Sequence, residues 1–171
     1  MTSCGPNTQS MNFSHMFDFN DINGKLPKKT YSKNSIMDVI NYHPDFTKFL
    51  YIVKLADMDN ILDKQQANFT LFVPSNSSIK DIREDIILNM DQGDAKNIVQ
   101  SSLLDYRIPK ELLVDSPAAY FNTLSPQNRM FVTNINSNTK INNTLNIVHF
   151  DIICTNGIIH VVDKLIRPLQ L

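Results

Sequence analysis

The sequence predicts an α+β domain in which helices come first and an antiparallel β-meander comes last. Between about residues 35 and 106, apolar residues recur mostly at the spacing of helix faces. After Pro126 the period changes from about 3.6 to about 2, and short apolar runs alternate with turn-forming residues. Helices and strands that are segregated in this way indicate an α+β domain rather than a parallel α/β sheet.

Length and charge limit the number of domains and the class of partner. With 171 residues, of which 42% are apolar, the chain can bury one core but is short for two domains. The 16 basic and 17 acidic residues give a net charge of −1 and are spread along the chain. Proteins that bind nucleic acid usually carry a basic patch. We therefore expect one domain and no nucleic-acid partner.

The N-terminal part reads as an arm or linker. Residues 1–30 lack periodicity, contain two glycines and two prolines, and show neither a basic start nor the apolar stretch of a secretory signal. No window of the chain is apolar over the length that a membrane span needs. We expect an arm over residues 1–30, a domain over residues 31–171 and no membrane span, in a chain that is either intracellular or trimmed.

Two helices are predicted at the front of the domain. Ser35 is a suitable N-cap, because Asp38 follows three residues later and can complete a capping box. This helix ends at His43-Pro44, since proline disfavours helix in the preceding residue. The apolar positions of the first helix are Ile36, Val39 and Ile40, and those of the second are Phe46, Phe49, Leu50 and Val53.

The middle of the chain predicts a strand and two more helices. "FTLFV" (69–73) is rich in β-formers and stops at Pro74. "SNSS" then offers capping groups to a helix that carries Ile79, Ile82 and Ile86. A further helix is expected over residues 94–106.

Four strands are predicted near the C-terminus, over residues 129–135, 139–142, 145–153 and 157–166. Asn156-Gly157 predicts a hairpin, because both residues tolerate the positive φ of a type I′ turn. If these two residues form the loop, Thr155 opposes Ile158. Asp151 and His160 then lie on one face as diagonal neighbours.

Residue patterns give little support to catalysis or metal binding. Cys4 and Cys154 lie far apart in the sequence, and the four histidines show no ligand spacing. No G-x-S-x-G elbow is present, and four glycines in the whole chain leave no phosphate-binding loop. We expect no enzyme activity, no cofactor and no metal, and we interpret Cys154 as a small buried residue.

His160 allows two interpretations. It could pair with Asp151 for acid–base chemistry, or it could be a buried residue of the scaffold. An imidazole between Ile158-Ile159 and Val161-Val162 usually bonds a backbone carbonyl or a carboxylate, because an unpaired buried polar group costs about 1–3 kcal/mol. We favour the structural interpretation.

Two segments resemble the motifs of the fasciclin (FAS1) domain family. "FTLFVPSNSSI" (69–79) is similar to the first motif and "NGIIHVVDKLIRP" (156–168) to the second, and the resemblance extends from about Tyr31 to Leu169. It implies that the motif residues are structural: Phe72, Pro74, Asn76, Asn156, Gly157, His160 and Asp163.

The resemblance implies a fold and a function. The fold is a compact α+β domain with two small β-sheets in a wedge and helices packed along it. The function is non-catalytic adhesion at a cell surface or outside the cell, through an integrin-like receptor, a matrix protein, a glycan or homophilic contact. The alternative is an intracellular or particle-associated structural protein that retains the fold without adhesive activity.

The resemblance also implies candidate binding residues. Asp151-Ile152 stands where some adhesive members use an Asp-Ile pair, and such a carboxylate could complete the coordination of a receptor-held cation. The competing interpretation is that Asp151 lies at a strand edge and Ile152 is core. Tyr106-Arg107 stands where the family has Tyr-His, and the arginine there can still bind a carboxylate or sulfate.

Overall fold

The computed structural model describes residues 30–31, 33–79 and 83–167. Its helices are α2 (Ile36–Tyr42), η3 (Pro44–Phe46), α3 (Thr47–Leu55), α4 (Asp59–Leu62), α5 (Glu84–Leu88), α6 (Gln92–Ser101) and α7 (Lys110–Leu113). The predicted capping box is present, because the Ser35 and Asp38 side chains bond each other's backbone N–H groups. The predicted arm lies outside the described residues except for Thr30.

The described residues contain eight strands: β2 (Thr30–Tyr31), β3 (Phe69–Pro74), β4 (Leu103–Leu104), β5 (Ala118–Asn122), β6 (Arg129–Ile135), β7 (Asn138–Ile141), β8 (Leu145–Cys154) and β9 (Gly157–Val162). Their spatial order is β4-β3-β9-β8-β7-β6-β5, and β2 pairs with β8. The start of β8 pairs with β7 and the remainder pairs with β9, so this strand belongs to both small sheets.

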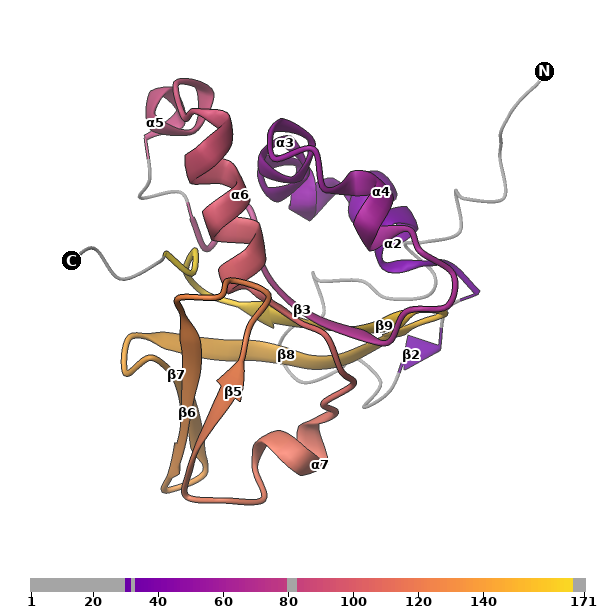
Figure 1. Ribbon diagram of the computed structural model, residues 1–171. Coiled ribbons are helices and arrows are strands. Elements are labelled where there is room, and N and C mark those ends of the chain that lie inside the picture. The colour runs from indigo at the N-terminus through magenta and orange to yellow at the C-terminus, as the bar shows by residue number, and fades with distance from the viewer. Residues whose placement is uncertain (1–29, 32, 80–82, 168–171) are drawn as a thin grey trace.

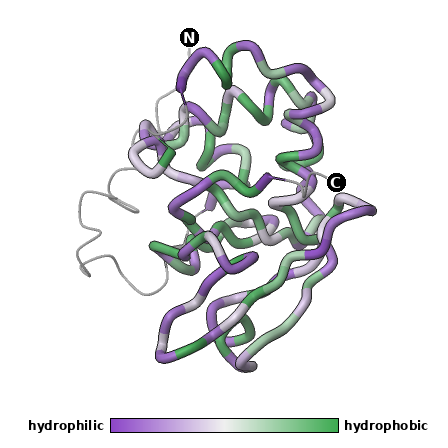
Figure 2. The backbone as a smooth tube through the Cα atoms, turned by 90° about the vertical axis from the view of Figure 1, so that its left-hand side faces the viewer, coloured by the Kyte–Doolittle hydropathy of each residue, from purple (hydrophilic) through white to green (hydrophobic). Residues whose placement is uncertain are grey.

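Figure 1 shows the layers that result. Helices α2 to α6 lie on one side of β3, β8 and β9, and β5 to β7 lie with α7 on the other side. In Figure 2 the hydrophobic stretches gather in the central strands and the inner sides of the helices. The architecture confirms the α+β prediction.

Two buried apolar clusters fill the two sides of the β3–β9 pair. Successive residues of a strand face opposite sides, so Leu71 and Val73 pack with the helices while Phe72 packs toward β6 and α7. β3 and β9 run parallel, and the register places Phe72 beside His160. His160 therefore faces the second cluster.

Some predicted helices were wrong in extent. Residues 76–79 form a turn that leaves Ile79 outside any helix, Ile82 lies outside the described residues, and Ile86 is about half-exposed in the five-residue α5. The helix expected over residues 94–106 ends at Ser101, because Leu103 and Leu104 pair with β3 as the edge strand β4.

The predicted β8–β9 loop was wrong by one residue, which shifts the strand register by two, so Ile158 pairs with Ile153 rather than with Thr155. Cys154 pairs with Gly157, so the loop is Thr155-Asn156, and neither Asn156 nor Gly157 has positive φ. Both central residues are left-handed instead in the turns at Asn136-Ser137 and Asn142-Asn143, as a type I′ turn requires.

Gly157 is required by a close approach rather than by its φ. A Cβ atom at this position would collide with the Phe69 carbonyl oxygen and would lie 2.7 Å from Ile36 Cδ1. The bare backbone of Gly157 thus lets β9 begin directly beside β3 and α2.

Candidate functional site

His160 is held by backbone groups on both ring nitrogens. Its Nδ1 accepts the N–H of Asp151 at 3.1 Å, so the proton is on Nε2, which donates to the Ile108 carbonyl at 2.8 Å. Burial lowers the pKa of His160 to about 4; the neighbouring His149 also lowers it, while the Ile108 carbonyl and Asp151 raise it. The imidazole is neutral at pH 7, and neither nitrogen is available to a substrate.

Asp151 sits in an irregular part of β8. The pairing with β9 shifts register between His149 and Ile152, and Asp151 itself has a φ of 63°. Its carboxylate oxygen Oδ1 accepts the backbone N–H of Lys110 at 3.0 Å, at the first residue of α7. The carboxylate thus satisfies an N–H group that the helix leaves unpaired.

Burial limits what Asp151 and Ile152 can contact. Asp151 is 4% exposed, and Ile152 is fully buried in the helix-side cluster opposite Ile159. So little exposed surface leaves the Asp151 carboxylate poorly placed to coordinate a receptor-held cation. The partner-binding role of this pair stays a prediction, and the geometry favours the structural interpretation.

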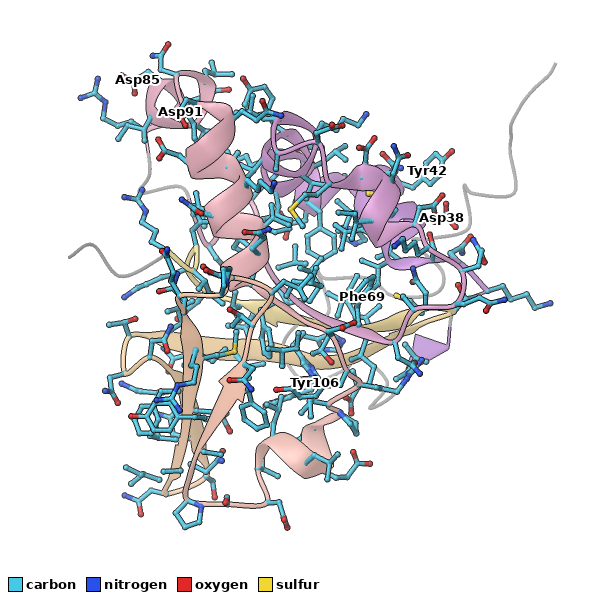
Figure 3. All side chains as sticks on the ribbon, viewed as in Figure 1. Asp38, Tyr42, Phe69, Asp85, Asp91 and Tyr106 are labelled. Carbon is cyan, nitrogen blue, oxygen red and sulfur yellow. The ribbon has the colours of Figure 1, made fainter. Side chains whose placement is uncertain are left out.

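Tyr106 and Arg107 are half-buried and more accessible. The Tyr106 hydroxyl accepts the Asn122 N–H at 3.1 Å, which joins it to β5; Figure 3 labels this residue near the central strands. Burial raises the pKa of Tyr106, and the hydrogen bond with Asn122 lowers it. Arg107 donates through Nε to Asn68 Oδ1 at 3.2 Å and through Nη2 to the Cys154 carbonyl at 3.4 Å.

The segment from Tyr106 to Lys110, called here the 106–110 segment, brings the candidates together. It contacts His160 through Ile108 and Asp151 through Lys110. Thr70 holds its middle, since its hydroxyl donates to the Tyr106 carbonyl at 2.7 Å and accepts the Ile108 N–H at 2.8 Å. Sequence reasoning missed Thr70, Ile108 and Lys110, because only long-range contacts reveal their roles.

The first motif holds the N-terminal end of α3 in place. Phe72 and Pro74 are buried in β3. The Asn76 side chain accepts the Lys48 N–H at 3.0 Å and donates to the Thr47 hydroxyl at 2.7 Å. Because Thr47 and Lys48 begin α3, Asn76 fixes this helix to the end of the strand.

The second motif uses its polar residues in the same way. Asn156 is fully buried; its oxygen accepts the Ile36 N–H at 2.9 Å, and its nitrogen donates to the carbonyls of Leu62 and Lys64 at 2.8 and 2.9 Å. The Asp163 carboxylate accepts both the backbone and the side-chain N–H of Asn146, at 2.8 and 2.9 Å. Both side chains have structural partners.

Cys154 is buried, as expected, and burial raises the pKa of its thiol above the ordinary range. Within the described part of the chain, no three His, Cys, Asp or Glu side chains are grouped to hold a metal ion. No helix there is both long and apolar enough to cross a membrane.

Asp151→Ala is expected to destabilise the domain by about 1–2 kcal/mol, because it leaves the partly buried Lys110 N–H at the start of α7 without its acceptor. Asp151→Asn should lose less, since asparagine keeps an acceptor and tolerates positive φ. Urea unfolding of both variants measures this. Equal losses would show that the carboxylate charge, rather than the hydrogen bond, stabilises the start of α7.

Comparisons with known proteins agree with the motifs. The model of the Fasciclin domain family matches residues 44–168. Human periostin is 30% identical over 142 residues, which cover 80% of this chain and 16% of periostin. Stabilin-2 from Rattus norvegicus is 33% identical over 106 residues, which cover 60% of this chain and 7% of stabilin-2. The chain therefore spans only a small part of either relative.

A solved structure shares the fold. It is a FAS1 domain pair from the insect cell adhesion molecule fasciclin I, matched with a TM-score of 0.68 and 22% sequence identity over 79% of this chain and 51% of that one. The family match covers most of the chain and includes all of both motifs. The chain belongs to the fasciclin domain family.

Proposed function

We propose that this chain is a non-catalytic adhesion or protein-binding module that acts at a cell surface or outside the cell. Its partner is a receptor, a matrix protein, a glycan or a second copy of the chain. The observation that carries the proposal is the fasciclin fold, shared with a domain pair from an insect cell adhesion molecule. Engagement of His160 by backbone groups on both ring nitrogens supports the non-catalytic part.

The accessible part of the predicted surface is the 106–110 segment. Arg107 uses Nε and Nη2 within the domain, which holds the planar guanidinium in place, and no other residue that the structure describes bonds its remaining N–H groups. A fixed guanidinium binds carboxylate or sulfate with little loss of side-chain entropy. We place partner contact at Tyr106 and Arg107. Asp151 supports this segment through its hydrogen bond with the Lys110 N–H, and the neighbouring Ile152 is buried.

A surface-attachment assay tests this placement. Beads coated with Arg107→Gln are expected to attach to cells or matrix several-fold less than wild-type beads, because the guanidinium contact is lost. Arg83→Gln is the matched control: it removes the same charge from an exposed arginine of the α5 start that already pairs with Asp85 at 2.7 Å. Equal attachment by well-folded Arg107→Gln would remove the 106–110 segment from the proposal.

The alternative is a structural protein inside a cell or particle. The arginine at position 107, where adhesive relatives are expected to have histidine, favours it. Protease treatment of intact cells or particles separates the two functions, with an internal protein as control. Digestion of this protein while the control survives supports adhesion, and survival until the membrane is broken supports the structural role.

A further inference from the structure

A pocket lies on the side of β5 and β6 that faces away from the core. Met130 and Val132 point inward from β6, so the residues that alternate with them point outward. The pocket has a volume of about 250 Å³. It is lined by Ser101, Tyr120, Asn128, Arg129, Phe131, Asn142, Asn143, Ile166 and Arg167.

An aromatic pair and an arginine form one wall of this pocket. Tyr120 on β5 lies opposite Phe131 on β6, with ring centroids 4.7 Å apart. The guanidinium carbon of Arg129 lies 4.4 Å from the Tyr120 ring centroid, within the range of a cation–π contact. Tyr120 is nevertheless 59% exposed, so its side chain remains accessible to a ligand in this aromatic platform.

The charged side chains that line the pocket have one sign. Its lining contains two guanidinium groups and no carboxylate. Among the described residues, neither Arg129 nor Arg167 has a hydrogen bond or an ion pair with another side chain. Lys164 lies close by, with its Nζ 3.3 Å from the Thr144 carbonyl at the β7–β8 turn. The adjacent carboxylate, Asp163, is turned to Asn146.

Amide groups complete the lining. Asn142 is fixed by a bond from the Phe131 N–H to its Oδ1 at 2.9 Å, which leaves its NH₂ group as a donor at the pocket. Asn143 is exposed next to it in the same turn. The side-chain NH₂ group of Asn128 donates to the Ser125 hydroxyl at 3.0 Å, which orients the side-chain oxygen Oδ1 of Asn128 as an acceptor. Donors and acceptors of this kind suit hydroxyl groups.

We propose that this pocket binds an acidic saccharide, one that carries carboxylate or sulfate groups. The apolar CH face of a sugar ring packs on an exposed aromatic side chain, its anionic group pairs with Arg129 and Arg167, and its hydroxyls bond the asparagines. The absence of any carboxylate from the lining excludes a cationic ligand by the same charge argument. The inference deepens the proposed binding role, and rests on it, by naming a ligand class and a second site.

Titration calorimetry with purified full-length chain tests the site. The probes are a heparin hexasaccharide, a hyaluronan hexasaccharide and the uncharged maltohexaose. At least one acidic probe is expected to bind, and maltohexaose is not. Arg129→Gln should weaken acidic-probe binding about tenfold or more, because a charge-assisted contact is lost. Arg83→Gln should leave the affinity unchanged.

A second pair of variants isolates the aromatic platform. Tyr120→Phe should bind as wild type, whereas Tyr120→Ala should bind several-fold more weakly; thermal unfolding checks that each variant is folded. Failure of both acidic probes, equal binding by Arg129→Gln, or equally tight binding of inorganic sulfate would overturn the saccharide site. If attachment depends on Arg107 but not on Arg129, the proposed adhesive function is supported and the saccharide site is not.

Discussion

Replacing Asn156 with alanine is expected to destabilise the domain by about 3–5 kcal/mol. The wild-type side chain pairs with the Ile36 N–H and with the carbonyls of Leu62 and Lys64 in a fully buried position. Each buried group left unpaired costs about 1–3 kcal/mol. Two buried groups, the Ile36 N–H and the Leu62 carbonyl, and the partly buried Lys64 carbonyl lose their partner in one substitution.

Urea unfolding at constant pH measures the loss, with Asn68→Ala as the matched control. Asn68 is exposed just before β3 and accepts one hydrogen bond, from Arg107. Its removal is expected to cost less than about 1 kcal/mol. Asn156→Asp should not rescue stability, since a carboxylate would face two carbonyl oxygens. A loss below about 1 kcal/mol for Asn156→Ala would mean that water replaces the amide, and would contradict the structural role assigned to the second motif.

Local sequence signals were sufficient where one segment determines its own conformation. The capping box at Ser35 is such a case, because both hydrogen bonds close within three residues. The alternation from Arg129 to Ile135 also predicts β6 correctly, since each residue needs only to face inward or outward. These features fixed the α+β class before any long-range contact was known.

Long-range pairing explains the predictions that failed. Leu103 and Leu104 continue the apolar face of α6 and were assigned to it, but the edge of β3 draws them into β4. The Asn156-Gly157 turn was misplaced because its sequence suits a type I′ loop. In the structure, Asn156 is engaged by α2 and α4, and Gly157 is needed beside Phe69.

The candidate site was only partly predictable for the same reason. His160 could be assigned to the scaffold from its aliphatic neighbours. The hydrogen bond of Asp151 could not be predicted, because its donor, the Lys110 N–H at the start of α7, lies 41 positions away in the sequence. The Tyr120 platform was missed altogether, since β5 reads as a weak strand until its register with β6 is known.

Acid is expected to destabilise this domain through His160. Burial lowers the pKa of the folded-state imidazole to about 4, against 6.5 for an unperturbed histidine. Between these values the unfolded chain binds a proton that the folded chain does not, so the stabilisation is complete above about pH 6.5 and is lost as the pH falls toward 4. The largest possible loss is roughly 3 kcal/mol.

The hydrogen bonds of His160 also predict that the domain loses stability when this residue is protonated. In the neutral ring, Nδ1 accepts the backbone N–H of Asp151 at 3.1 Å. A protonated ring carries N–H groups on both nitrogens, so its Nδ1–H would face the N–H of Asp151. Protonation therefore replaces an attractive contact with a repulsive one. Because the other nitrogen bonds Ile108, the 106–110 segment should be the first part of the domain to loosen in acid.

His160→Gln supplies the comparison that isolates this histidine. Glutamine does not titrate, so subtracting its free energy of unfolding from that of the wild type, at each pH from 7 to 4.5, cancels the contribution of the carboxylates. The difference is expected to shrink steadily below pH 6.5. A difference that stays constant over this range would show that His160 binds its proton equally in both states, which the buried, backbone-bonded geometry does not permit.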